Sequence, residues 1–112
     1  MLVTREEVLH EDGSLGYVES IFKSANILKT VYFARTEKLY ITFSRGNTYL
    51  YTDVDLGFYK RFETAESNGK FFHQYIKNKV PFYKEYTYYP HEVQQLKEIV
   101  ENFNQEQDGE DD

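Results

Sequence analysis

Three tyrosine side chains, Tyr40, Tyr49 and Tyr51, fall in two neighbouring segments whose residue types are typical of β-strands. Aromatic rings exposed on a sheet can stack on unpaired nucleic-acid bases, because every base offers an aromatic face. The same rings can equally fill a core, with the hydroxyl group reaching a polar partner at its rim. The chemistry available to these tyrosines therefore depends on the face of the sheet to which they point.

The turn between the two segments decides that face. A two-residue loop, Arg45-Gly46, puts all three tyrosines on one face, opposite the aliphatic side chains of the first strand. A three-residue loop, Ser44-Arg45-Gly46, shifts the register by one residue and turns Tyr49 and Tyr51 towards the core. Glycine in the left-handed region is common at the end of three-residue loops, and this favours the second register.

Basic side chains are interleaved with the aromatic residues and can track the phosphates of a nucleic acid. Arg45 at the expected hairpin tip, and Lys77 and Lys79 in a Lys-Asn-Lys segment, are the first candidates for such contacts. Acidic residues are interleaved as well, whereas a nucleic-acid binder usually shows a clear basic excess. An ordinary solvated surface is therefore the simpler interpretation of these charges.

Charge is unevenly distributed along the 112 residues, which carry a formal net charge of −6. Residues 104–112 contain five acids and no basic residue, and the rest of the chain holds 13 basic and 14 acidic residues. A nearly neutral body thus precedes an acidic end. The loss of apolar residues after Phe103 predicts a disordered tail over residues 104–112.

No recognised pattern for catalysis, metal binding or membrane insertion is present in the sequence. The three histidines are far apart, the glycines do not cluster as a phosphate-binding loop, and there is no cysteine. No apolar run is long enough to span a membrane, and residues 1–10 lack the apolar stretch of a signal peptide. We expect a cytoplasmic, non-enzymatic protein without a cofactor or a metal ion.

The elements that must position these residues begin with an antiparallel β-meander. Residues 27–33, 38–43 and 48–52 are rich in β-branched and aromatic side chains and are separated by short polar turns. In residues 1–22, Asp12-Gly13 suits the turn of a β-hairpin, although Arg5-Glu6-Glu7 could equally start a helical turn.

After the meander the hydrophobic period changes to three and four. Asp55 can cap a short helix, and Ser67-Asn68-Gly69 can cap a second one that ends before Pro81. Residues 82–89 form an extra strand or an extended segment, and an apolar stripe over residues 91–103 predicts a C-terminal amphipathic helix. The sequence therefore predicts an α+β fold with three to five strands, whose helices all pack on one face of the sheet.

An ordered series of residues between Ser24 and Tyr83 resembles the KTSC domain. This short module is named for its occurrence at the C-terminus of some lysyl-tRNA synthetases, and it also occurs as stand-alone bacterial and phage proteins. The matching residues are Ser24-Ala25-Asn26-Ile27, Leu39, Ile41, Phe43, Gly46, Tyr49-Leu50-Tyr51, Val54, Ala65, Ser67, Gly69, Phe71-Phe72 and Ile76. Asp55 departs from the proline that often follows the valine, and His73 departs from the usual asparagine.

The resemblance divides the chain into an extension of residues 1–22, a KTSC-like domain of residues 23–86, a C-terminal helix of residues 87–103 and the acidic tail. It implies a small sheet with helices, and its link to a synthetase suggests RNA binding. Our leading hypothesis is a non-enzymatic accessory module that binds RNA or single-stranded DNA through Tyr40, Arg45, Tyr49, Tyr51, Lys77 and Lys79. The alternative is a protein-interaction adapter, for instance phage-encoded and acting on a host protein, with its interface in residues 82–103.

Overall fold

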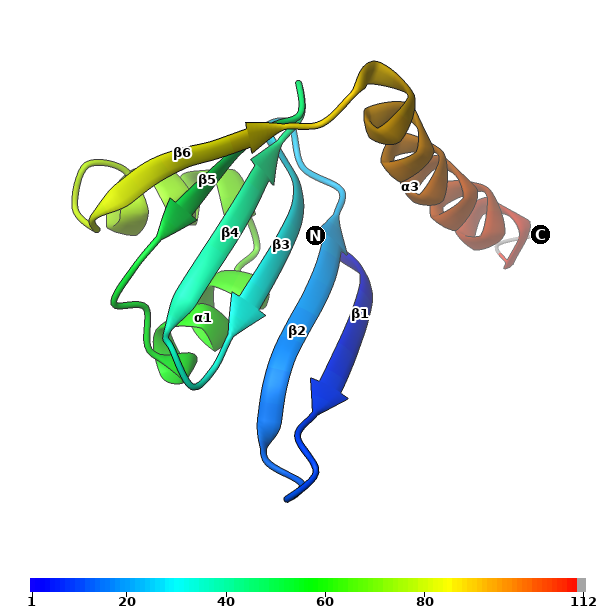
Figure 1. Cartoon of the computed structure of the whole chain (residues 1–112). Helices are drawn as coiled ribbons and strands as arrows, with labels where there is room; N and C mark the ends of the chain where they lie inside the picture. The colour runs from blue at the N-terminus through cyan, green and yellow to red at the C-terminus, as the bar shows by residue number, and fades with distance from the viewer. Residues whose placement is uncertain (111–112) are drawn as a thin grey trace.

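The computed structural model describes residues 1–110, with side chains up to Phe103, and contains one open antiparallel sheet whose six strands follow the order of the chain (Figure 1). The strands are β1 (Leu2–Leu9), β2 (Leu15–Phe22), β3 (Ile27–Phe33), β4 (Lys38–Phe43), β5 (Asn47–Tyr51) and β6 (Phe82–Thr87). Between β5 and β6 lie α1 (Leu56–Glu63), α2 (Asn68–Phe71) and a π-helical turn, η1 (Phe72–Ile76), and α3 (Pro90–Glu110) follows β6. The α+β class is confirmed, and the strand number is six rather than the expected three to five.

The additional strands lie at the two edges of the sheet. β1 and β2 form a hairpin whose turn contains Gly13 at a φ of +85°, so Arg5-Glu6-Glu7 lie in a strand and not in a helical turn. β6 pairs with β5, and all six of its side chains are exposed. A strand that buries neither face has no hydrophobic alternation, which explains why the sequence left its conformation open.

One face of the sheet is covered by α1, α2 and η1. Tyr59 and Phe62 of α1 are fully buried, and the ring of Tyr59 stacks on that of Tyr32 with 4.6 Å between centroids. The core beneath the helices also contains Val18, Phe22, Ile27, Leu39, Ile41, Tyr51, Val54, Phe72 and Ile76. Those that lie in β2 to β5 point to the covered face of the sheet, while Val54 follows β5 and Phe72 and Ile76 come from η1.

The helices begin where the sequence offers capping side chains. Asp55 accepts a hydrogen bond from the backbone N–H of Phe58 at 2.8 Å, and Ser67 accepts one from Lys70 at 3.2 Å. Each cap satisfies an amide that would otherwise have no partner in the first turn. The caps therefore define the start of α1 and of α2.

A buried polar cluster joins the N-terminal hairpin to α1. The carboxylate of Glu63, which is only 5% exposed, accepts hydrogen bonds from Arg5 Nε at 2.8 Å, Ser20 Oγ at 2.8 Å and the hydroxyl of Tyr59 at 3.1 Å. The Tyr59 hydroxyl also lies 2.9 Å from Thr30 Oγ1. A buried carboxylate needs partners of this kind, so β1 and β2 belong to the same folded unit as α1.

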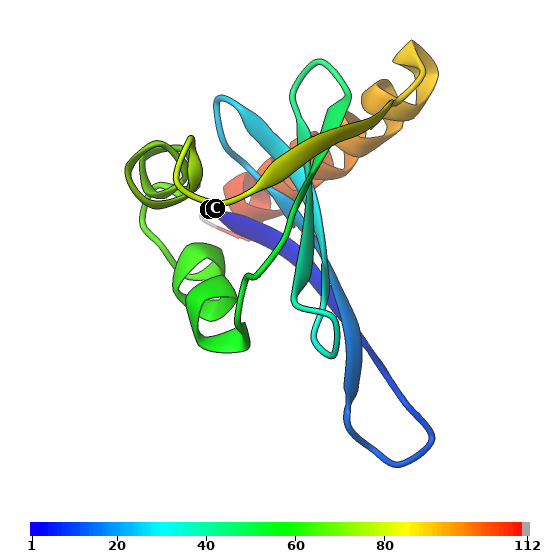
Figure 2. The ribbon, with the colours of Figure 1, turned by 60° about the vertical axis from the view of Figure 1, so that its left-hand side comes forward.

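Helix α3 lies away from the face that α1 covers, which corrects the expectation that all helices pack together (Figures 1 and 2). It contacts β2 and β3, and its Lys97 and Val100 line a hollow together with residues of the β2–β3 connection and Ser44 of the β4–β5 turn. Val93 packs so closely on Gly46 that a Cβ atom there would lie 2.9 Å from Val93 Cγ2. The position of α3 follows from the pairing of β6 with β5. Thr87 pairs with Asn47, so the end of β6 and the start of α3 lie beside the β4–β5 turn.

The backbone of α3 continues beyond Phe103 to Glu110, through most of the segment for which the sequence predicts disorder. Glutamine and glutamate recur between Asn104 and Glu110, and both are good helix formers. Residues 111–112 of the expected tail lie outside the described residues. None of the helices described in residues 1–110 is both long and apolar enough to cross a membrane.

Candidate functional site

The β4–β5 turn has the three-residue form, Ser44-Arg45-Gly46. Gly46 adopts a φ of +95°, and its N–H donates to the carbonyl of Phe43 at 2.8 Å. The resulting Cα partners are Leu39 with Tyr51, Tyr40 with Leu50 and Ile41 with Tyr49. This is the second of the two registers considered from the sequence, and it places Tyr49 and Tyr51 on the face covered by helices.

The three tyrosines therefore do not form one stacking platform. Tyr51 is 4% exposed and belongs to the core, and Tyr49 is half-buried at its edge. Tyr40 points to the opposite face, where its ring packs edge-on against Phe33 with 5.8 Å between centroids. Any ligand that contacts Tyr49 lies on the other side of the sheet from Tyr40.

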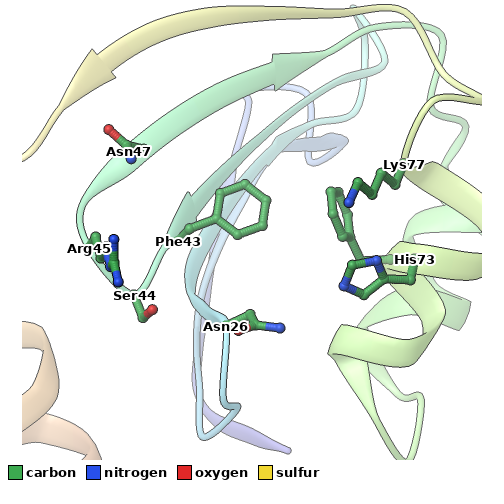
Figure 3. A pocket seen from close by; sticks show the side chains of 8 residues that line it. Asn26, Phe43, Ser44, Arg45, Asn47, His73 and Lys77 are labelled. Carbon is green, nitrogen blue, oxygen red and sulfur yellow. The ribbon is translucent and has the colours of Figure 1, made fainter.

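A groove runs between the covered face of the sheet and η1 (Figure 3). Its central section, of about 300 Å³, is lined by Asn26, Phe43, Ser44, Arg45, Asn47, Phe72, His73 and Lys77. A neighbouring aromatic section, of about 210 Å³, is lined by Phe43, Tyr49, Tyr51, Phe72, Lys77, Asn78 and Phe82. The two sections share Phe43, Phe72 and Lys77 and therefore lie side by side.

The walls of the groove come from two different elements. Arg45 stands on the β4–β5 turn, while His73 and Lys77 come from η1 and its C-terminal end on the opposite wall (Figure 3). Between them, the rings of Phe43 and Phe72 meet edge-on at 5.2 Å. The N–H of Lys77 donates to the carbonyl of Phe72, five residues earlier, at 2.8 Å, which is the bond of a π-helical turn. Such turns are rare and occur frequently at functional sites.

The aromatic section offers ring surface beside a neutral hydroxyl group. Phe82 is 49% exposed, and its ring lies 6.2 Å from that of Tyr49 and 6.0 Å from that of Tyr51. Burial, with a smaller effect of the neighbouring Tyr49, raises the pKa of Tyr51 to about 12. The Tyr51 hydroxyl therefore stays protonated at neutral pH.

The charge of the central and aromatic sections is entirely basic. Arg45, His73 and Lys77 line them, and no acidic side chain among the described residues does so. Within residues 1–103 these three side chains are also absent from the ion pairs, which instead join other bases, such as Lys29 and Arg35, to acids. The groove thus presents basic side chains that no acidic side chain of residues 1–103 pairs with. Within the described residues, no three histidine, aspartate or glutamate side chains converge as metal ligands.

A third section, of about 260 Å³, extends the groove past His73. It shares Asn26 and His73 with the central section and is lined further along by Lys23, Lys70 and Glu66, among other residues. Glu66 is the acidic side chain of this end. The groove therefore changes along its length from aromatic, through basic, to mixed charge.

Four of the six side chains predicted as a nucleic-acid site come together in the groove, namely Arg45, Tyr49, Tyr51 and Lys77. Tyr40 lies on the opposite face. The ammonium group of Lys79 donates to the backbone carbonyl of Gln74, and its side chain lines a separate hollow beside Pro81. These two residues lie outside the groove.

Sequence reasoning did not select His73, Asn26, Asn47, Phe43 and Phe72 as site residues. His73 is one of the three histidines whose spacing shows no metal-binding pattern, and its side chain is exposed and faces the groove. The available signal was the spacing of Lys70, His73 and Lys77 at three and four residues, which puts them on one side of a helical segment.

The fold defines a small α+β domain in which an open antiparallel meander is covered by helices on one face. A family model described as the KTSC domain matches residues 23–82, more than half of the chain. The structure is also similar to the crystal structure of a KTSC domain protein from Yersinia pestis, with a TM-score of 0.59 and 31% sequence identity over 61% of this chain and 96% of that chain. A comparison with curated proteins gave no match. The chain belongs to the KTSC domain family, which confirms the resemblance noted in its sequence.

The family match covers the groove and leaves the flanking elements outside. The lining residues of the central and aromatic sections, from Asn26 to Phe82, all lie in residues 23–82. The β1–β2 hairpin, most of β6 and the whole of α3 lie outside that segment. The residues that line these two sections therefore all belong to the segment that matches the family, whereas the flanking elements lie outside it.

Proposed function

We propose that this protein is a non-enzymatic accessory module that binds single-stranded RNA or DNA in the groove between η1 and the sheet. The observation that carries the proposal is the lining of the central and aromatic sections, where Arg45, His73 and Lys77 accompany aromatic rings, of which Phe82 is exposed, and no acidic side chain of the described residues takes part. Single-stranded nucleic acid presents the matching chemistry, with a phosphate charge on every nucleotide and an aromatic face on every base.

A single strand suits the groove better than a duplex does. Base stacking on protein rings requires unpaired bases, and the rings here line a recess rather than an open surface. The amide side chains of Asn26 and Asn47 border the same recess and can donate and accept hydrogen bonds at a base edge. A duplex would keep its bases away from both the rings and the amides.

A second candidate is supported by a separate feature, the exposed aromatic residues of β6 and the segment after it. Tyr83 is 60% exposed and Tyr89 is 69% exposed, and β6 is an edge strand that could pair with a peptide strand. However, Lys84 lies in the middle of β6 and the β5–β6 pairing is irregular beside it, two features that discourage strand addition. We therefore place the protein-adapter function second.

The proposal is tested by fluorescence anisotropy with labelled RNA and DNA oligomers of about 12 nucleotides, single-stranded and duplex, at low and moderate salt. We expect single strands to bind more tightly than duplexes and binding to weaken as salt increases. Arg45→Ala should weaken binding about tenfold, which corresponds to about 1.4 kcal/mol. Tyr40→Ala, on the opposite face, serves as the matched control and should bind as the native chain does.

Absence of binding to any oligomer at low salt would overturn the proposal. So would binding that Tyr40→Ala weakens and Arg45→Ala leaves unchanged, because the ligand would then lie on the outer face of the sheet.

A further inference from the structure

The helical wall of the groove carries a row of basic side chains, Lys70, His73 and Lys77. All three are exposed, and each lines the groove: Lys70 in the third section, His73 in the central and third sections, and Lys77 in the central and aromatic sections. Lys70 lies on α2, His73 on η1 and Lys77 directly after η1, so the three side chains follow one another along this helical segment. The row therefore runs lengthwise through the groove.

The opposite wall has a different character. It offers the amides of Asn26 and Asn47 and one cation, Arg45, at the β4–β5 turn. The exposed ring surface is concentrated at the end of the groove next to Lys77, where Phe82 and Tyr49 lie. The row of basic side chains thus faces the two amides and Arg45 across the groove, and the exposed ring surface lies at one end of it.

We infer that a bound single strand lies along the groove, with consecutive phosphates on the row of Lys70, His73 and Lys77 and a base stacked on Phe82 at the aromatic end. This inference rests on the proposed function and adds the orientation of the strand to it. Lysine and histidine side chains on the row neutralise phosphates without reading sequence, whereas the asparagines and the rings meet the bases. The module then binds a short unpaired segment through its backbone with weak dependence on sequence.

Glu66 indicates where the strand ends. It lines the third section together with Lys70, beyond His73, and a carboxylate at that point repels a further phosphate. The strand therefore passes from the aromatic end to Lys70 and leaves the groove there. Replacing Glu66 by glutamine should remove the repulsion and strengthen binding, in the opposite direction to the substitutions that remove a basic side chain from the groove.

The row is tested by the salt dependence of binding. Each phosphate contact to a single strand contributes about −0.7 to the slope of log K against log salt, so Lys70→Gln and Lys77→Gln should each flatten the slope by about that amount. Lys60→Gln is the matched control, since it removes the same charge from an exposed position on α1 outside the groove lining. It should leave the slope unchanged.

His73 provides a second readout that a merely structural residue would not give. His73→Gln should weaken binding of the single strand, whereas His73→Lys, which keeps a basic group at this place in the row, should preserve it. Equal weakening by both substitutions would indicate that His73 has a structural role only.

Base stacking is tested with oligomers that carry one abasic nucleotide at successive positions. The native chain should bind one of these oligomers distinctly more weakly than the rest. Phe82→Ala should lose affinity for intact strands and no longer distinguish that oligomer.

The outcomes separate the two proposals. If the native chain binds no oligomer, the proposed function itself fails. If the native chain binds but Lys70→Gln and Lys77→Gln behave like Lys60→Gln, the function stands and the lengthwise placement is wrong. If these two variants flatten the slope while every abasic oligomer binds alike, the stacking part of the inference is wrong.

Discussion

Replacing Arg5 by methionine should destabilise the whole domain, although Arg5 lies in the N-terminal hairpin and outside the segment that the family model matches. Arg5 Nε donates to the buried carboxylate of Glu63 on α1 at 2.8 Å. Methionine keeps much of the aliphatic length of arginine but removes the charge. Glu63 then keeps only the hydrogen bonds from Ser20 and Tyr59, with no positive charge beside it.

The magnitude follows from the burial of the two partners. Glu63 is 5% exposed, and removing one partner of a buried ion pair typically costs about 3–5 kcal/mol because an uncompensated charge remains. The Arg5 side chain is 31% exposed and also contacts Glu7, so water screens part of the interaction. We therefore expect a loss of about 1–3 kcal/mol in the free energy of unfolding.

The assay is equilibrium urea unfolding of the native chain, Arg5→Met, Glu63→Gln and the double variant at neutral pH. Glutamine at position 63 removes the charge that Arg5 compensates while keeping the shape of the side chain. The cost of Arg5→Met should therefore fall below about 1 kcal/mol in the Glu63→Gln background, and the difference measures the coupling. An equal cost in both backgrounds, or a cost near zero in the native one, would refute this account of how the hairpin is held to α1.

Two further predictions concern the turn and the buried tyrosines. Gly46→Ala should lower the free energy of unfolding by about 1–3 kcal/mol, because Gly46 has a φ of +95° and the added Cβ would meet Val93. The loss of this contact should also speed hydrogen exchange in α3. Unchanged thermal unfolding would contradict this packing. Burial raises the pKa of Tyr32 and of Tyr51 to about 12, whereas a tyrosine in the unfolded chain ionises near its ordinary value of 10. The stability that these two residues contribute is fully present below about pH 10 and is lost as the pH rises towards 12. Chemical unfolding between pH 9 and about 12, followed with tyrosinate absorbance, should show this loss, and Tyr51→Phe should reduce it; a flat profile would contradict it.

The sequence predicted those parts of the fold that local chemistry determines. Asp55 and Ser67 marked the starts of α1 and α2 because a capping side chain needs only its own first turn. Gly46 favoured the correct register of β4 and β5 because the turn type depends on a positive φ at one position. In each case a single residue carried the information.

The remaining features depend on contacts between distant segments. The position of α3 could not be read from its apolar stripe, because the stripe shows that one side is buried and not which surface buries it. The pairing of β6 with β5 determines that surface, because it places the start of α3 beside the β4–β5 turn. The two paired strands lie more than thirty residues apart in the sequence. The groove has the same origin, since its lining reaches from Asn26 to Phe82.

The net charge of the chain did not indicate the basic lining of the groove, because it does not show where in the fold the charges lie. The nearly neutral body argued against a nucleic-acid site, since a balance of bases and acids predicts no basic surface. In the structure several of these charges cancel each other in pairs away from the groove, as Lys29 does with Glu19 and Arg35 with Asp12. Binding responds to the local field rather than to the total, and a recess lined by cations concentrates that field. A short anionic strand can therefore find a favourable site on a protein whose overall charge is negative, provided that the acidic side chains lie elsewhere.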